Sequence, residues 1–230
     1  MELIVHESSL LLKKKVLAPS GSPEALWGAA DMFPSNTSVA LPLNVAPPGS
    51  SSGVSFVSNA PAPIPNAALF TSSNAQIALT NTPYQLHGYA DFCVEWWMAV
   101  NGPSTIASLW HPGTASGCAW STSMNMTGVG MSANASVNLA TYSEDGLFAV
   151  GVWAHCAISR QSTATRIFVN GILKQTTTTS LDFFTGDLPF YLGYRNESVG
   201  LGGGGYLAGF RLTRGNARYT QSFTPSTVFQ

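Results

Sequence analysis

The sequence predicts an all-β fold, a two-sheet antiparallel sandwich preceded by an extended N-terminal arm. Apolar and polar residues alternate on both sides of Asn170-Gly171, which is the strongest short-range signal for a two-residue β-hairpin. From Ser38 onward, strand-like runs recur about every ten residues with turn residues between them, a spacing typical of sandwiches. The sequence has no internal repeat, and helical periodicity is absent outside the arm.

The arm, residues 1–34, differs in character from the rest of the chain. Its two short apolar runs and its lysine triplet are followed by a linker-like stretch rich in Pro, Ser and Gly. Residues 24–32 suit one or two helical turns, with Ser22 as N-cap and Pro23 at the first position. The apolar runs are too short for a core, and an isolated lysine triplet is also compatible with a solvated face. We expect the arm to bind a partner through Leu3, Ile4, Val5, Leu10, Leu11, Leu12, Lys13, Lys14 and Lys15.

Residues 35–230 are expected to form one domain. Its first strand covers residues 39–43, where Pro42 indicates an edge position, and residues 47–53 and 61–65 are interpreted as loops. Further strands are predicted at residues 67–71, 75–80, 91–100, 104–110, 117–126, 136–142, 147–160, 165–176, 188–194 and 206–214.

Alternation assigns side chains to faces in two of these strands. In the run from 92 to 98, the period of two places Phe92, Val94, Trp96 and Met98 on one face and Cys93, Glu95 and Trp97 on the other. Ile167 and Val169 should likewise share a face, with Phe168 opposite.

Composition limits the function. Only 9% of the residues are charged and the net charge is -1, which disfavours nucleic acid and anionic membranes as partners. No run approaches the ~20 apolar residues of a membrane span, and the lysines follow the first apolar run, unlike a signal peptide. The three cysteines lack metal-ligand spacing, and we expect reduced, buried thiols at Cys93 and Cys156. Weak surface charge suits a protein packed into an assembly, although secreted adhesins share it.

Several motifs carry a family resemblance. They are a Trp-x-His strand entry at 153–155, the hairpin Arg166-Ile-Phe-Val-Asn-Gly171, the strand Gly205-Tyr-Leu-Ala-Gly-Phe-Arg-Leu212 and the closing Ala217-Arg-Tyr-Thr-Gln-Ser-Phe-Thr-Pro225. Together they resemble the concanavalin-A-like, laminin-G-like jelly-roll family over residues 37–227. The closing motif is similar to those of bacteriophage tail and surface proteins. This resemblance implies a virion structural protein, assembled in the host cytoplasm, with other virion proteins as partners and a homo-oligomeric state.

The residues give little support to catalysis. Glycosidases of this fold need two carboxylates facing each other across a cleft. Asp91 opens its strand and is expected to cap a turn, and Glu95 is expected to make a satisfied polar contact. His155 is interpreted as a packing residue, and no Gly-x-Ser-x-Gly elbow is present. We therefore expect a protein that is not an enzyme.

No cofactor is predicted. The acidic loop pairs Glu144-Asp145 and Asn196-Glu197 lack the repeated spacing that calcium prefers and support it only weakly. The glycine run at 200–205 precedes a strand instead of a helix, so it does not suit a phosphate loop.

Aromatic residues suggest an alternative function, in which the protein binds glycans on a host surface. Sugars stack on aromatic rings, and five residues are candidates for lining a concave sheet face, although about half would serve the core or an interface instead. These candidates are Trp97, Trp110, Trp120, Tyr142 and Tyr194.

Overall fold

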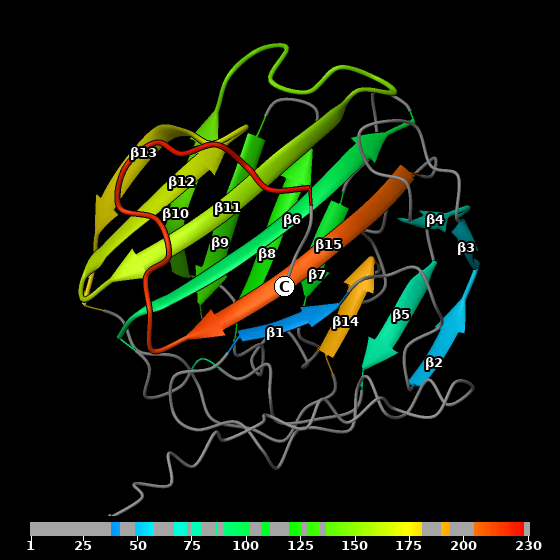
Figure 1. Cartoon of the computed structure of the whole chain (residues 1–230), viewed down its shortest axis with the longest axis horizontal. Coiled ribbons are helices and arrows are strands. Elements are labelled where there is room, and N and C mark those ends of the chain that lie inside the picture. Colours follow the sequence, from blue (N-terminus) through cyan, green and yellow to red (C-terminus); the bar gives the residue numbers. More distant parts are fainter. Residues whose placement is uncertain are drawn as a thin grey trace, which may run out of the picture.

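A computed structural model describes residues 38–41, 49–57, 67–72, 75–79, 86, 90–101, 107–110, 120–125, 128–133, 137–180, 190–193 and 205–227. These residues contain fifteen strands and no helix (Figure 1). Every strand pairing is antiparallel, and the strands form two sheets, so the predicted all-β sandwich is confirmed. The arm, residues 1–34, with its candidate partner-binding residues and helical turns, lies outside the described residues.

The larger sheet, called sheet A, has eight strands. Its order is β13 (Ile172–Thr178), β12 (Ala164–Val169), β11 (Trp153–Gln161), β6 (Phe92–Val100), β15 (Gly205–Arg214), β4 (Ala67–Phe70) and β3 (Val54–Val57). The remaining strand, β1 (Ser38–Leu41), pairs with β15. The first strand that the structure describes therefore begins at Ser38, one residue before the first strand predicted at 39–43.

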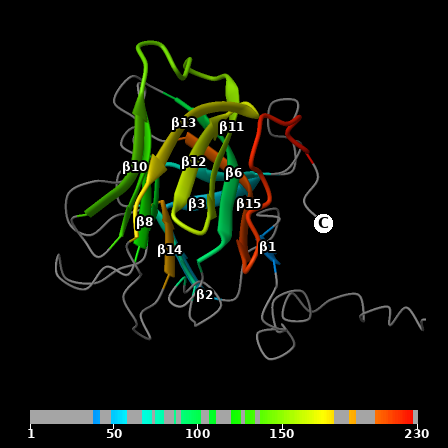
Figure 2. The same ribbon diagram turned by 90° about the vertical axis from the view of Figure 1, so that its left-hand side faces the viewer.

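The second sheet, called sheet B, has seven strands. Its order is β10 (Val137–Ser143), β9 (Gly128–Ala133), β8 (Trp120–Asn125), β7 (Ala107–Trp110), β14 (Phe190–Gly193), β5 (Gln76–Leu79) and β2 (Gly49–Ser52). Figure 2 shows the two sheets from the side, as separate layers.

The hairpin predicted at Asn170-Gly171 joins β12 to β13. Both turn residues have positive φ, 50° at Asn170 and 76° at Gly171, as a mirror-image turn requires. The turn is also fastened to β11, because the Asn170 amide donates to the His155 carbonyl at 2.8 Å and the His155 amide donates to Asn170 Oδ1 at 2.9 Å. Asn170 therefore shapes the turn and anchors it.

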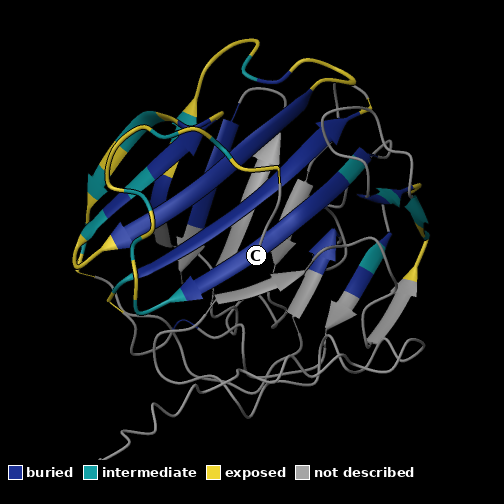
Figure 3. Cartoon of the chain, viewed as in Figure 1, coloured by how far each residue is buried: buried dark blue, intermediate teal, exposed yellow. Residues whose placement is uncertain are grey.

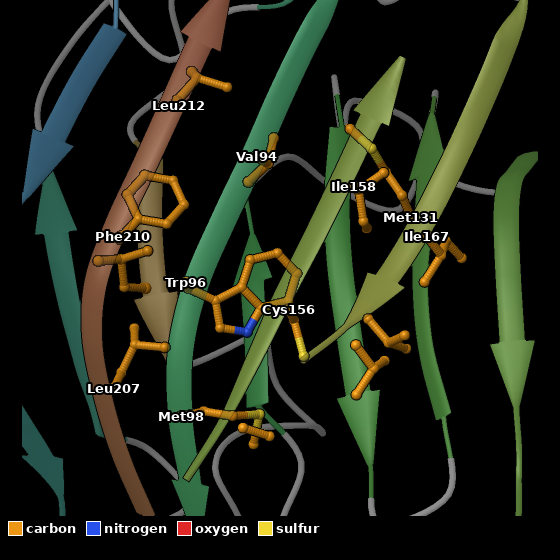
Figure 4. Close-up of a cluster of buried hydrophobic side chains, with 14 of the residues drawn as sticks. Val94, Trp96, Met98, Met131, Cys156, Ile158, Ile167, Leu207, Phe210 and Leu212 are labelled. Carbon is orange, nitrogen blue, oxygen red and sulfur yellow. The ribbon is translucent and has the colours of Figure 1, made fainter. Parts of the chain in front are cut away.

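The core lies between the sheets, and the predicted alternation holds in it. Phe92, Val94, Trp96 and Met98 are buried in one cluster with Ile167 and Val169. Figure 4 shows Val94, Trp96, Met98 and Ile167 in this cluster, and Figure 3 colours the central strands of sheet A as buried. Glu95 and Phe168 face the other side of sheet A, where they contact residues of the C-terminal segment. The described cysteines, Cys93 and Cys156, are buried free thiols as expected, and burial raises the pKa of both. Cys118 lies outside the described residues.

Three strands depart from the sequence prediction. Residues 49–52, interpreted as part of a loop, form β2 and pair with β5, and the strands β3 and β9 were not anticipated. Glycine and serine disfavour strands locally, so β2 depends on its partner strand and not on its own propensity. Gly53 is the one residue between β2 of sheet B and β3 of sheet A, and its φ is positive, 64°. The strand predicted from residue 147 begins only at Trp153, after a turn-rich loop.

Candidate functional site

The C-terminal strap, residues 215–227, lies across the outer face of sheet A (red trace in Figure 1). It begins with a hydrogen bond from the Gly215 amide to the Asp91 carbonyl at 2.8 Å. Further along, the Tyr219 amide donates to Ser159 Oγ at 3.2 Å, and the Phe223 amide donates to the Gly171 carbonyl at 2.8 Å. The closing motif that carried the family resemblance is thus the segment that covers this face.

Aromatic rings fill the space between the strap and the sheet. The rings of Tyr219 and Phe223 stack, with centroids 3.5 Å apart and planes within 4° of parallel. Both meet Phe168 edge to face, at 6.1 and 5.4 Å, and Phe223 also contacts His155 at 5.7 Å. Trp97 packs against His155 at 5.2 Å and donates from Nε1 to the Ser226 carbonyl at 2.9 Å.

Beneath this layer lies Glu95, whose side chain is 1% exposed. Arg211 on β15 donates from Nε to Oε1 at 2.8 Å, and Arg218 of the strap lies 3.3 Å from the same oxygen. The second oxygen, Oε2, accepts from the Tyr219 hydroxyl at 2.9 Å and lies 3.2 Å from His155 Nε2. The carboxylate therefore joins β6, β11, β15 and the strap.

A β-bulge places Arg211 in this cluster. The pairing of β15 with β6 shifts register between Ala208 and Arg211, next to Gly209 with φ of 54°. The shift puts Phe210 into the core and Arg211 on the outer face beside Glu95. Without the bulge, alternation counted from Leu207 would place Arg211 in the core and Phe210 outside.

The surroundings of Glu95 determine its protonation. Burial alone would raise the pKa of this carboxyl, but the hydrogen bond with His155 and the positive charge of Arg211 outweigh burial and hold the pKa below its usual value. The neighbouring carboxylate and burial raise the pKa of Tyr219 to about 12, with burial the larger cause. The cluster thus holds an ionised Glu95 and a neutral Tyr219.

Two other carboxylates of the described residues, Asp91 and Glu144, contact a turn and a surface ion-pair partner. Asp91 Oδ1 accepts from the Ser162 amide at 2.7 Å, in the β11–β12 turn, so its predicted capping role is confirmed. Glu144 accepts from the Tyr142 hydroxyl at 2.6 Å and from Lys174 Nζ at 2.9 Å. Glu95 makes the satisfied polar contact that the sequence predicts. Three further acids, Asp182, Asp187 and Glu197, lie outside the described residues.

Sheet B presents a different outer face. Ile77, Val129, Met131 and Leu192 point into the core, so the alternate positions of their strands face away from it. The register aligns five such positions across β14, β7, β8, β9 and β10. These positions, which we call the Trp110 row, are Tyr191, Trp110, Ser121, Ser132 and Asn138.

A second row runs beside the first on the same face. Ser108, Ser123, Gly130 and Thr141 are aligned across β7, β8, β9 and β10. Thr141 and Ser143 are exposed. The seven strands of sheet B contain no Asp, Glu, Lys, Arg or His residue.

Two of the five aromatic glycan candidates, Trp97 and Tyr142, have described side chains, and these lie in different sheets. Trp97 is 8% exposed and lies beneath the strap. Tyr142 is half-buried, packs against the core and donates to Glu144. Trp110 is paired with Ser121, whereas Trp120 is paired with Ala133, so the two tryptophans occupy positions of opposite parity in sheet B. The structure does not describe the side chains of Trp110 and Trp120, and Tyr194 lies outside the described residues.

Some site residues were missed by the sequence prediction. The sequence did not identify Arg211, Arg218 and Tyr219 as partners of Glu95. Two of them, Arg218 and Tyr219, belong to the closing Ala-Arg-Tyr motif. Among the described residues, no three His, Cys, Asp or Glu side chains are grouped so that they could hold a metal ion. Within the same part of the chain, no helix has the length and apolar character to cross a membrane.

Comparison with known proteins bears on this fold. A family model described as "Concanavalin A-like lectin/glucanases superfamily" matches residues 71–214, more than half of the chain. The chain belongs to this superfamily. No curated protein matches the sequence. The resemblance inferred from the hairpin and the β15 motif is therefore confirmed at the level of the family.

Solved structures with the same fold are distant in sequence. Domain 4 of the extracellular arabinanase AbnA from Geobacillus stearothermophilus, solved with arabinotriose, has a TM-score of 0.53 and 17% identity, and the match covers 77% of this chain and 82% of that one. The binding domain of botulinum neurotoxin serotype D has a TM-score of 0.53 and 13% identity, with coverage of 81% and 44%. The same toxin's ligand-binding domain with N-acetylneuraminic acid has a TM-score of 0.50 and 13% identity, with coverage of 74% and 43%. This chain thus matches under half of the toxin domains. At these identities the likeness shows the fold alone.

Proposed function

We propose that this chain is a non-enzymatic glycan-binding module displayed on the surface of a phage virion. Its sandwich carries the glycan site, and residues 1–34 attach it to other virion proteins. The observation that carries the glycan-binding part is the Trp110 row, which brings a tryptophan, a tyrosine, two serines and an asparagine into line on the outer face of sheet B. Trp and Tyr stack on the apolar sides of sugars, and hydroxyl and amide groups hydrogen-bond sugar hydroxyls.

The two faces of the sandwich favour sheet B as the glycan site. The outer face of sheet A is covered by the strap from Gly215 to Ser226. Its buried carboxylate, Glu95, is held by two arginines, a histidine and a tyrosine, and therefore lacks the open cleft that a glycosidase acid needs. The relatives solved with arabinotriose and with N-acetylneuraminic acid are consistent with a binding role for this fold.

The proposed place on a virion is supported by the closing motif and by the low charge of the chain. The closing motif at 217–225 is similar to those of phage tail and surface proteins, and the low charge suits a protein packed among others. Displayed appendages are usually symmetric, so we propose a homo-oligomer. We propose no resident metal, and glycan binding is expected to survive chelation of calcium.

The test is binding of the purified full chain to an array of glycans. We expect binding by the wild-type protein, loss of binding in Trp110→Ala, and loss in Ser132→Lys, which adds bulk to the same row without removing an aromatic ring. Lys174→Gln, on β13 of sheet A and outside the row, is the matched control and should bind normally. Melting curves must show that each variant is folded. Absence of binding to any glycan, or full binding by both folded row variants, would overturn the proposal.

A further inference from the structure

The residues of sheet B also indicate the chemical class of the ligand. We infer that the outer face of sheet B binds an uncharged, extended oligosaccharide that lies across the strands, through contacts that do not depend on salt. This inference rests on the proposed glycan-binding function and specifies its ligand.

The described strands of sheet B carry no charged side chain. All seven strands of sheet B consist of uncharged residues, whereas sheet A carries Glu95, His155, Arg160, Arg166, Lys174, Arg211 and Arg214. A sugar carboxylate or sulfate placed on these strands would lose hydration without gaining a cationic partner from them. A neutral sugar has no such cost, because its hydroxyls exchange hydrogen bonds with water for hydrogen bonds with serine, threonine and asparagine.

An ion pair lies at the rim of sheet B, beside β10. Glu144, which follows β10, and Lys174 on β13 form an ion pair at 2.9 Å. Each group holds the other in its charged form: the hydrogen bond from Lys174 lowers the pKa of Glu144, and Glu144 raises the pKa of Lys174. At the β10 edge, the described residues of the rim therefore present a mutually neutralised pair close to Tyr142, in place of an unpaired cation that would attract an acidic glycan.

The two arginines that hold Glu95 on the far side of sheet A lie too far from sheet B to replace a local cation. Arg211 and Arg218 are committed to Glu95 on the opposite outer face, beneath the strap. The two sheets of a sandwich lie about 10 Å apart, and salt screens exposed charges beyond about 8 Å at physiological ionic strength. A ligand on sheet B would thus experience little of that charge.

Both rows of sheet B run across the strands and span several of them. The Trp110 row crosses five neighbouring strands, which at a spacing of about 4.8 Å gives a length of roughly 19 Å. The second row, with Ser108, Ser123 and Thr141, runs parallel to it. Such a line of polar positions suits several linked sugars lying across the strands better than a single terminal sugar.

The experiment compares neutral and acidic polysaccharides as probes for the full chain. A β-glucan, a mannan and a galactan are the neutral probes, and alginate, hyaluronan and polysialic acid are the acidic ones. Because an uncharged ligand has no Coulomb energy to screen, the Kd for a neutral probe should stay within about twofold between low and high salt. Oligosaccharides of increasing length should bind more tightly until the row is filled.

Thr141→Lys is the informative variant, because Thr141 is exposed on the second row. It should gain salt-sensitive binding to the acidic probes, while the matched Lys174→Gln variant should not. A wild-type preference for acidic probes that weakens with salt would overturn this inference and leave the proposed function standing. Binding to neither class, with dimers or larger species in light scattering that Thr141→Lys disperses, would show that a second copy occupies this face and would overturn both.

Discussion

Glu95 shows how much one residue's environment depends on the rest of the chain. Its place on the outer face of β6 follows from alternation, and the sequence predicts a satisfied polar contact there. The identity of the partners does not follow, because Arg211 and Tyr219 are more than a hundred positions away in the sequence. Arg211 reaches Glu95 only because of the bulge at Gly209, which alternation cannot foresee.

Glu95→Gln should destabilise the domain and change its response to acid. Loss of the charge leaves two arginines without their buried counterion, a change that typically costs about 3–5 kcal/mol. The pKa of Glu95 is lowered in the folded state, so its stabilising effect is complete above the unfolded-state pKa and is lost as pH falls through the folded-state pKa. The free energy of unfolding, measured with urea from neutral to acidic pH, should fall less steeply in the variant. Parallel pH profiles for both proteins would contradict this role.

Tyr219→Phe removes one hydroxyl from the same cluster and keeps the ring that stacks on Phe223. A hydrogen bond to a buried charged group contributes about 1.5–3 kcal/mol, and this is the expected loss in the free energy of unfolding. Tyr142→Phe is the matched control, because it removes a tyrosine–glutamate hydrogen bond at an exposed site. The control should lose much less stability, because water screens an exposed contact. Equal losses in the two variants would mean that the strap contact is no stronger than a surface contact.

Among the strands and turns, some form because of their local sequence and others because they pair with strands elsewhere in the chain. The Asn170-Gly171 hairpin was predictable because both of its turn residues tolerate positive φ and both strands alternate. The glycine- and serine-rich strands β2 and β9 were not, because they depend on pairing with β5, β8 and β10. The closing motif was noticed as a family feature, but its role as a strap requires the positions of Trp97, Phe168 and Gly171 in space.

Gly171→Ala tests the contact between the hairpin and the strap. An added Cβ would collide with the Phe223 carbonyl and lie 2.8 Å from Pro225 Cδ. Positive φ adds a cost of order 1–3 kcal/mol for a non-glycine residue. Gly146→Ala is the control, since Gly146 has a similar φ of 72° and nothing within 4 Å of its added Cβ.

Hydrogen exchange in residues 215–227 distinguishes these two variants. Gly171→Ala should release the strap, so that amide exchange in this segment accelerates, whereas Gly146→Ala should leave it protected. Unchanged protection in Gly171→Ala would show that the strap does not depend on this close approach.

For the whole molecule, the sandwich and its family could be predicted from the sequence. The strap over sheet A and the alignment of residues across sheet B could not. Period-two patterns identify faces within a strand, but only the register between strands aligns Trp110 with Ser121 and separates it from Trp120. Of the other aromatic candidates, Trp97 lies beneath the strap on sheet A, and Tyr142 packs on the core.

Deletion of residues 1–20 tests the attachment role that we propose for the arm. The described sandwich strands begin at Ser38, and we propose that the apolar residues of the arm pack against a partner. We expect a folded, soluble protein with a nearly unchanged Tm that is no longer incorporated into particles. Unfolding of the truncated protein would instead make the arm part of the domain, and normal incorporation would remove its role in attachment.

The most direct test of the account maps the ligand on the two faces. Hydrogen exchange of the full chain, measured with and without a neutral oligosaccharide that binds it, reports on each strand separately. The proposed site predicts increased protection in β7, β8, β9 and β10, with exchange in the strap and in β11 and β12 unchanged. Protection confined to the strap and the outer face of sheet A, or absent from sheet B at saturating ligand, would contradict the assignment of glycan binding to sheet B.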